Sequence, residues 1–316
     1  MDPASYNVIK DIADERAGDE RTGLVFIDEF GHRRDYRFAE IFEQSLRYAA
    51  VLFAFGVARG DRVLMRTSNT AKSAFTLLGL ARLGAVPVLC VETMDDAKIA
   101  ALAQTSGAAC IVANRRHVGA ADALRRQMPG VTRHISIGEE RDGWSRLDSL
   151  VTRAAPHEGI ELDANDCAIV VEGEQHSRED LDEARAAIVS ANRIVSSDVV
   201  WCSAPFGSAL WFEYALFAPW SRGAATVLHE GSFEPRERLD LVRELDVTVL
   251  IQSAREYAAE LQIEEPLRFR HPRLRRCEID ADSIEPDLAD RWQSARGLSI
   301  EPAARVFTPR MGTRMQ

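Results

Sequence analysis

The sequence lacks the features of a membrane-spanning, secreted or nucleic-acid-binding protein. No apolar run reaches the ~20 residues that a helix needs to cross a bilayer. Residues 1–20 are too acidic and polar for a signal peptide. Lysine and arginine number 39 against 49 aspartates and glutamates, and the net charge of −10 argues against a broad phosphate-binding surface. We therefore expect a cytoplasmic protein with no membrane span and no nucleic-acid partner.

Local motifs of metalloenzymes and hydrolases are also missing. Five cysteines occur without CxxC spacing, which indicates buried reduced thiols and argues against metal ligands. The seven histidines never form HxH or HExxH, and there is no GxSxG nucleophile motif. The sequence therefore offers no metal site and no catalytic residue that spacing alone can identify.

The sequence does contain a long alternation of two hydrophobic periodicities. After a hairpin around residues 29–32, apolar strand-like runs alternate with helical patterns of ten or more residues. This alternation predicts mainly parallel sheets with helices on both faces. A polar stretch at residues 152–166 separates two halves. We expect an α/β fold of two packed doubly wound subdomains, residues 1–160 with the N-terminal hairpin and residues 161–316.

One part of the chain resembles a known family. The run Gly56–Ala113 contains GDRV at the start of a strand, Ser68-Asn69 at its exit, and LGAVPV between a helix and the next strand. It is similar to the N-terminal lobe of the adenylate-forming ligases, which include acyl-CoA synthetases, aryl-acid AMP ligases and luciferase. The second half follows the same family order more weakly. The resemblance implies the fold of that N-terminal domain and, for an active member, ATP and Mg as cofactors.

The family's phosphate loop, of the type TSGTTGKPKG, should follow the strand DCAIVVE. This sequence has EGEQ there, with Gly173 as the one remaining glycine and no lysine. Two glutamates would repel a triphosphate, and His176 and Arg178 are the remaining candidates for anion contact near this degenerate loop. Ser177 and Asp180 fit an S-x-x-D helix cap, so we interpret the segment as a shortened strand-to-helix turn.

Two further nucleotide sites of the family are altered. The loop of the SGGAP type corresponds to Ile279–Ser283, where both glycines are replaced and two acids stand. A YGxTE segment cannot be aligned within Arg305–Thr313. The chain stops at Gln316, before the position of the family's C-terminal domain with its adenylation lysine. These differences together predict poor adenylation by the chain alone.

The organic acid of the family lies beside the helix after the SAP-like strand. Here Phe206, Ser208 and Trp211 are the candidates for the lining of an apolar acid pocket. The alternative, which we favour, is that these aromatic residues pack in the core or at an interface.

Two functional hypotheses remain open, with no cofactor expected under the first. One is a noncatalytic ligase-like protein, a pseudoenzyme that serves as partner or scaffold subunit for a complete ligase or a separate C-terminal domain. The other is a residual carboxylate-activating ligase that uses ATP and Mg and is completed by another chain. A simple binder of aryl or acyl carboxylates is an intermediate form.

Overall fold

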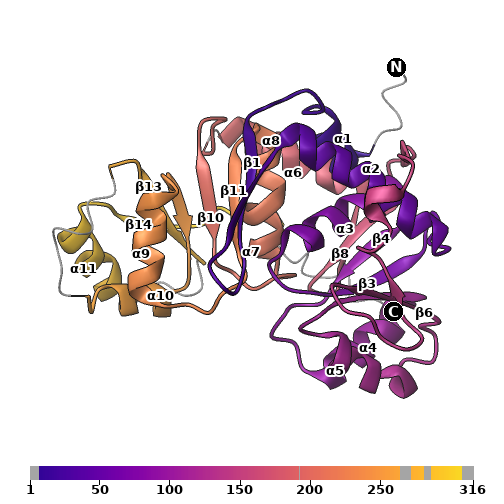
Figure 1. The fold of residues 1–316 in the computed structure, drawn as a ribbon. Coiled ribbons are helices and arrows are strands. Elements are labelled where there is room, and N and C mark those ends of the chain that lie inside the picture. Colours follow the sequence, from indigo (N-terminus) through magenta and orange to yellow (C-terminus); the bar gives the residue numbers. More distant parts are fainter. Residues whose placement is uncertain (1–6, 192, 264–271, 281–285, 308–316) are drawn as a thin grey trace.

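The computed structural model describes residues 7–191, 193–263, 272–280 and 286–307, and these form two seven-stranded sheets (Figure 1). The first sheet has the spatial order β14 (Ile300–Pro302), β13 (Arg276–Ile279), β12 (Val249–Ile251), β10 (Val199–Cys202), β11 (Ala225–His229), β1 (Thr22–Ile27), β2 (Arg33–Arg37). The second has the order β7 (Ser145–Arg146), β6 (Arg133–Ile137), β5 (Cys110–Asn114), β3 (Arg62–Arg66), β4 (Val86–Leu89), β8 (Cys167–Val171), β9 (Glu174–Ser177). In each sheet every pairing is parallel except that of one edge strand, β2 or β9. The expected α/β fold with mainly parallel sheets is confirmed.

Three hydrophobic clusters show how the helices cover these sheets. The central cluster joins the facing sides of both sheets to the helices between them: α1 (Val8–Asp14), α2 (Phe38–Ala54), α3 (Ala71–Arg82), α6 (Arg178–Ala191), α7 (Ala209–Trp211), η3 (Phe212–Phe217) and α8 (Ala218–Arg222). A second cluster lies under α4 (Asp96–Ser106) and α5 (Val118–Ala123), and a third under α9 (Pro235–Glu244), α10 (Ala254–Glu260) and α11 (Pro286–Arg296). The short 3-10 turns are η1 (Arg125–Gln127) and η2 (Val151–Arg153). The layers therefore run helix, sheet, helix, sheet, helix.

Alternation along single strands explains this layering. In β3, Val63 and Met65 belong to the central cluster, while Leu64 between them belongs to the cluster under α4. In β10, Val200 and Cys202 face the central helices and Trp201 faces α9 and α10. Successive side chains of a strand point to opposite faces, so a strand buried on both faces is apolar throughout.

The sheets do not divide at residue 160 as the two-half organisation implies. The N-terminal hairpin β1–β2 pairs with β11, so it belongs to the sheet formed mainly by the second half. Conversely, β8 pairs with β4 and brings β9 into the sheet of the first half. The physical reason is that β11 and β4 would each leave an unpaired edge on their sheet. The hairpins β1–β2 and β8–β9 pair with these edges. A domain boundary at 160 stays a prediction.

The helical stretch after β10 is longer than expected and irregular. The prediction placed an apolar helix at Trp211–Trp220, whereas helical structure runs from Ala209 to Arg222 with a π-helical segment, η3, in the middle. The hydroxyl of Thr226 donates a hydrogen bond to the carbonyl oxygen of Ala215 at 2.7 Å, within this segment. Insertion of a side chain into the hydrogen-bond ladder is a recognised cause of helix distortion.

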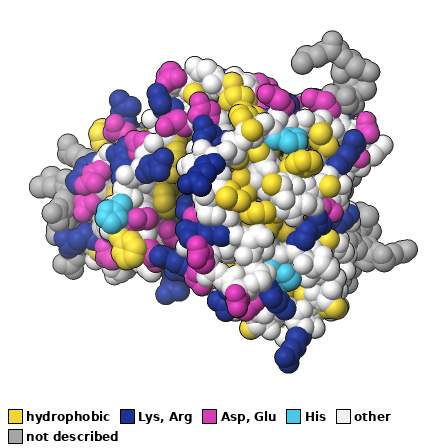
Figure 2. All heavy atoms as spheres, turned by 45° about the vertical axis from the view of Figure 1, so that its right-hand side comes forward, with side chains coloured by type: hydrophobic (Ala, Val, Ile, Leu, Met, Phe, Trp, Pro, Cys, Tyr) yellow, Lys and Arg dark blue, Asp and Glu magenta, His cyan; other side chains and the backbone are white. Residues whose placement is uncertain are grey.

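The exposed surface carries charges of both signs. Figure 2 shows acidic and basic side chains intermingled, together with a group of hydrophobic side chains on the same face. Four of the five cysteines are buried, Cys167 is partly exposed, and all five are free thiols, as predicted. Within the described ranges, no helix combines the length and apolar character that crossing a membrane requires.

Candidate functional site

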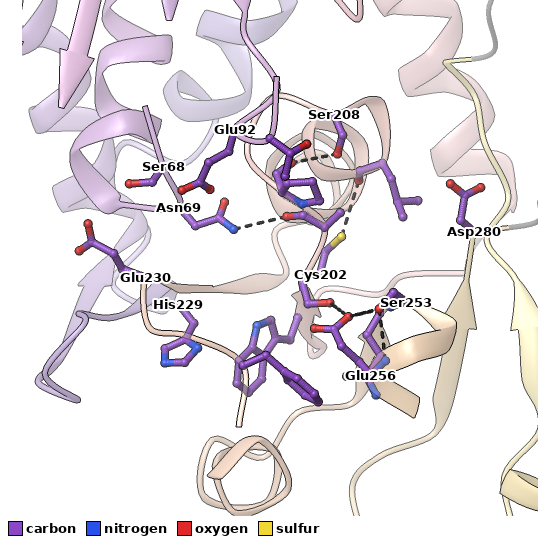
Figure 3. Close-up of a pocket in the computed structure, with 18 of the residues that line it drawn as sticks. Ser68, Asn69, Glu92, Cys202, Ser208, His229, Glu230, Ser253, Glu256 and Asp280 are labelled. Atoms are coloured by element: carbon purple, nitrogen blue, oxygen red, sulfur yellow. Dashed lines mark hydrogen bonds between the residues drawn. The ribbon is translucent and has the colours of Figure 1, made fainter. Parts of the chain in front are cut away.

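A cavity of about 710 Å³ lies at the carboxyl ends of strands from both sheets (Figure 3). It is lined by Ser68 and Asn69 after β3, by residues 203–205 after β10, by Glu230 after β11 and by Gln252 after β12. Strand order reverses at β3 in one sheet and at β10 in the other, because the next two parallel strands added lie on opposite sides of each. Ligands in open α/β sheets bind at such switch points. The topology therefore marks this cavity as the candidate site.

Hydrogen bonds within one sheet and between the two sheets hold the walls of the cavity. The side-chain amide of Asn69 donates to the carbonyl oxygen of Ala204 at 3.4 Å, and Asn114 donates to the hydroxyl of Ser68 at 2.5 Å. The backbone N–H of Glu92 donates to the carbonyl oxygen of Phe206 at 2.9 Å. The contacts of Asn69 and Glu92 join the ends of β3 and β4 to the segment after β10, and that of Asn114 joins the ends of β5 and β3.

A carboxylate with several donors lies on the wall formed by α10. Oε2 of Glu256 accepts hydrogen bonds from the hydroxyls of Ser203 and Ser253 and from the backbone N–H of Ser253, each at 2.8 Å. Ser253 and Glu256 also form the capping box of α10, which explains their spacing in the sequence. Figure 3 shows Glu256 beside Ser253 at the base of the cavity.

The lining of the cavity is strongly charged. Nine ionisable acidic or arginine side chains line it: Glu92, Glu172, Glu230, Glu256, Asp280, Arg116, Arg238, Arg255 and Arg305. Arg116 pairs with Glu92 at 3.2 Å, and Arg305 pairs with Asp280. Sites for apolar ligands are lined mainly by hydrophobic side chains. Trp201, Leu210 and Phe233 also line this cavity, so its wall combines charged and apolar surface.

The segment that follows β8 differs from the predicted strand-to-helix turn. It is a hairpin in which Val171 pairs with Glu174 and only Glu172 and Gly173 form the turn. Both turn residues have positive φ, 51° and 84°, which is the geometry of a type I′ hairpin turn. The strand β9 was missed because it has only four residues, EQHS, and is polar throughout. It therefore lacks the apolar alternation of a strand and reads as the start of the helix that follows.

The predicted helix cap at this segment is confirmed. The hydroxyl of Ser177 accepts from the backbone N–H of Asp180 at 3.1 Å, and Oδ2 of Asp180 accepts from the backbone N–H of Ser177 at 2.8 Å. Arg178 is buried and forms an ion pair with Asp182 at 2.6 Å. The ring of His176 packs edge-on against Phe307, with 5.2 Å between the ring centroids.

The residues of this hairpin do not fit a triphosphate. A phosphate cradle needs several successive backbone N–H groups that point at the anion, usually with a lysine. A two-residue turn supplies no such run, and Glu172 and Glu174 flank it with negative charge. The side chain of Glu172 reaches from the turn to the cavity wall. There its Oε1 accepts a hydrogen bond from the backbone N–H of Ala209 at 3.0 Å.

The three candidates for the acid pocket have different positions. Ser208 lines the cavity, and its hydroxyl caps the helical stretch by accepting from the backbone N–H of Trp211 at 3.2 Å. Phe206 and Trp211 are fully buried, with their ring centroids 4.4 Å apart, and neither is among the cavity-lining residues. Their position agrees with the packing interpretation.

Burial changes the protonation of several groups at or near the cavity. It lowers the pKa of His229 to about 4, with a smaller effect from the positive charge of Arg238. It raises the pKa of Glu230, with a further contribution from Glu29. Behind the cavity, burial raises the pKa of Glu213 to about 8, although its carboxylate accepts backbone hydrogen bonds from Val306 at 3.2 Å. Desolvation disfavours the charged form in each case.

Parts of the other two predicted nucleotide segments lie outside the described residues, namely Ala281–Ser283 and Thr308–Thr313. Ile279 ends β13, and Asp280 and Arg305 form an ion pair at the cavity. Among the residues that the structure places, no group of three histidine, cysteine, aspartate or glutamate side chains is arranged to hold a metal ion.

Sequence reasoning missed the side chains that dominate this site: Arg238, Gln252, Ser253 and Glu256. A signal was available, because Gln252 and Ser253 directly follow the apolar strand β12, and polar residues at the carboxyl ends of parallel strands meet at one edge. Arg238 gave no such signal, since it stands among other charges in an amphipathic helix.

Two parallel-dominated sheets meet at a cavity at their switch points, which is where open α/β folds bind their ligands. The family model for AMP-binding enzymes matches residues 13–171, half of the chain. The chain belongs to the AMP-binding enzyme family, as the resemblance implied.

Known relatives agree with this assignment. The chain is 24% identical over 319 residues to the human mitochondrial acyl-coenzyme A synthetase ACSM3, covering 94% of this chain and 54% of the relative. It is 21% identical over 317 residues to the acyl-CoA ligase YtcI of Bacillus subtilis, covering 94% of this chain and 58% of that protein. The chain thus spans little more than half the length of these relatives.

Solved structures show the same fold. An anthranilate CoA ligase, AuaEII, in complex with anthranoyl-AMP, superposes with a TM-score of 0.83 at 19% identity, covering 94% of this chain and 59% of that one. A benzoate CoA ligase from Burkholderia xenovorans superposes with a TM-score of 0.78 at 21% identity, covering 95% of this chain and 61% of that one. The fold is that of the N-terminal part of adenylate-forming ligases.

Proposed function

We propose that this chain is a noncatalytic, ligase-like member of its family that acts as a partner or scaffold subunit of a complete ligase. The observation that carries the proposal is the two-residue turn between β8 and β9, with Glu172 directed to the backbone N–H of Ala209. A carboxylate at this position opposes a polyphosphate through charge repulsion, and the turn supplies no run of donors. A cytoplasmic location is part of the same proposal.

The direct test is association. The chain would be coexpressed with complete adenylate-forming ligases of the same organism, and the complexes separated by size-exclusion chromatography. We expect a stable complex and a changed rate of the ligase when the chain is present. The absence of both association and any change in rate contradicts the proposal.

A second candidate is a carboxylate-activating ligase that another chain completes, using ATP and Mg. Family membership over residues 13–171 and the cavity at both switch points favour it. Acid-dependent pyrophosphate exchange by the chain, alone or with a complementing C-terminal domain, tests it. Exchange above background supports this candidate and overturns the first.

A further inference from the structure

Residues 303–307, which follow β14, run from the first sheet to the second, and we call them the strap. At its start, the backbone N–H of Ala303 donates to the carbonyl oxygen at the end of β13 at 2.8 Å. At its end, Phe307 is 4% exposed, and its ring centroid lies 5.2 Å from that of His176 on β9. The strap therefore contacts both sheets.

A fully buried carboxyl group holds the middle of the strap. Glu213, in the π-helical segment η3, is 1% exposed, and both of its oxygens lie 3.2 Å from the backbone nitrogen of Val306. The backbone N–H of Phe307 also donates to this carboxyl group. One side chain thus satisfies two consecutive backbone donors, as a capping residue does at the start of a helix. The backbone of the strap is therefore bound to an ionisable group.

The other contacts between η3 and the strap do not change charge near neutral pH. The hydroxyl of Tyr214 donates to the carbonyl oxygen of Ala304 at 2.6 Å, and burial raises the pKa of Tyr214 above its usual range. The ring of Phe307 packs against those of Phe212 and Phe217, with centroids 5.3 and 5.5 Å apart. Segments of π-helix often occur at functional sites. Here the π-helical segment supplies every one of these partners of the strap.

The ionisable groups that face Glu213 come from four segments: Arg305 on the strap, Glu278 on β13, Cys202 on β10 and Tyr214 on η3. Burial is the largest influence and raises the pKa of Glu213 to about 8, and the negative charge of Glu278 acts in the same direction. The two backbone donors and Arg305 act in the opposite direction. Cys202 stays uncharged, because burial raises its pKa to about 12. With the strap in place, Glu213 is therefore mainly a neutral acid at pH 7.

We propose that Glu213 is a proton-controlled latch, which holds the strap closed against η3 while it carries a proton and opens the strap when it ionises. An ionised carboxylate gains far more from contact with water than the neutral acid does. Arg305 lines the cavity and is ion-paired with Asp280, which Figure 3 shows at the edge of the cavity. Opening therefore moves Arg305 out of the wall and widens access to the cavity. This device acts whether or not the chain binds a nucleotide.

The direction of the pH dependence follows from the protons that each state binds. The pKa of Glu213 is about 8 with the strap closed and returns toward the ordinary value of 4.5 when the strap opens into water. Between these values the closed strap holds the extra proton, so the ratio of open to closed strap rises by up to about tenfold per pH unit. Below about pH 4.5 and above about pH 8, both states bind the same number of protons and the ratio is constant.

Hydrogen exchange of the intact chain, followed by mass spectrometry from about pH 5 to pH 9 and corrected for the intrinsic exchange rate, tests the latch. We expect the protection of residues 303–307 to fall by up to about tenfold per pH unit and to level off above about pH 8. Peptides from β3 should stay better protected at every pH, because the opening is local. Glu213→Gln keeps an acceptor but cannot ionise, so its strap should show no such fall.

Two variants serve as matched controls. Tyr214→Phe removes the hydrogen bond to Ala304, so it should lower the protection of the strap about threefold to tenfold at every pH and keep the slope. Glu260→Gln removes another buried acid, whose pKa burial also raises to about 8, and it too should keep the slope.

Three results would overturn the proposal: constant protection of the strap across this pH range in the parent chain, an unchanged slope in folded Glu213→Gln, or exchange of the strap only together with β3. Circular dichroism establishes that each variant is folded. If Glu213→Gln is not, the slope in the parent chain and its persistence in Glu260→Gln decide the question.

Discussion

Oε1 of Glu172 accepts a hydrogen bond from the backbone N–H of Ala209 at 3.0 Å, and this contact joins the two sheets at the mouth of the candidate site. Glu172 extends from the turn after β8, and Ala209 begins the helical stretch after β10. The carboxylate of Glu172 thus accepts the hydrogen bond of a backbone N–H at the place where the family resemblance implied a phosphate loop. The turn that we propose excludes a polyphosphate also links the two sheets.

The first prediction concerns this link. Glu172→Ala should lower the free energy of unfolding by about 1 kcal/mol, because a charge-assisted hydrogen bond to a backbone N–H is lost. Urea unfolding with fluorescence detection measures the change. Glu174→Ala, in the same hairpin, is the control and should change the free energy by less than about 0.5 kcal/mol. Equal effects of the two substitutions would show that the Ala209 contact contributes nothing.

A pair of glycines separates backbone strain from steric contact. Gly173 and Gly207 both have φ of 84°, but a Cβ at Gly173 would meet nothing within 4 Å, whereas at Gly207 it would lie 2.5 Å from the carbonyl oxygen of Cys90. Gly173→Ala should cost about 1–2 kcal/mol from the left-handed backbone alone. Gly207→Ala should cost about 1–3 kcal/mol more, because it also overpacks the contact between the sheets.

Thermal and urea unfolding of both alanine variants check this difference. Gly130→Ala, at a glycine with ordinary φ and a nearest neighbour at 3.7 Å, serves as the control. If Gly207→Ala were as stable as Gly173→Ala, the close approach of Gly207 to Cys90 would be wrong.

The third prediction is a pH dependence from Glu213, which is 1% exposed and whose pKa is raised to about 8 by burial. An unfolded glutamate has its ordinary pKa near 4.5, so between these values the folded chain binds the extra proton. The contribution of Glu213 to stability is therefore fully present below about pH 4.5 and is lost as pH rises toward about 8. The loss from this group is at most about 5 kcal/mol.

Glu213→Gln should remove this contribution and flatten the stability profile between about pH 5 and 9. The glutamine keeps an oxygen to accept from the backbone N–H of Val306. Urea unfolding across this pH range measures the profile, with Glu43→Gln on the exposed face of α2 as the control. A residual slope is expected, because burial also raises the pKa of Glu260 to about 8. An unchanged slope in Glu213→Gln would contradict the account.

The parallel layering and the cap of α6 could be predicted because local patterns carry them. Alternating strand and helix periods fixed the class of fold, and Ser177 with Asp180 gave the start of α6 within one residue. The pairing of β1 with β11 could not be predicted, because residues about 200 positions apart meet there through an edge that has no local signal. Likewise, Arg238 becomes a site residue only when α9 packs over Trp201.

The most direct test of the central claim is a calorimetric titration of the purified chain with MgATP, with a full-length acyl-CoA synthetase in the same buffer as positive control. With a two-residue turn and Glu172 at the place of the phosphate loop, we expect no saturable binding, that is, a dissociation constant weaker than about 1 mM. Saturable binding in the micromolar range would show that the hairpin accommodates a triphosphate and would contradict the account.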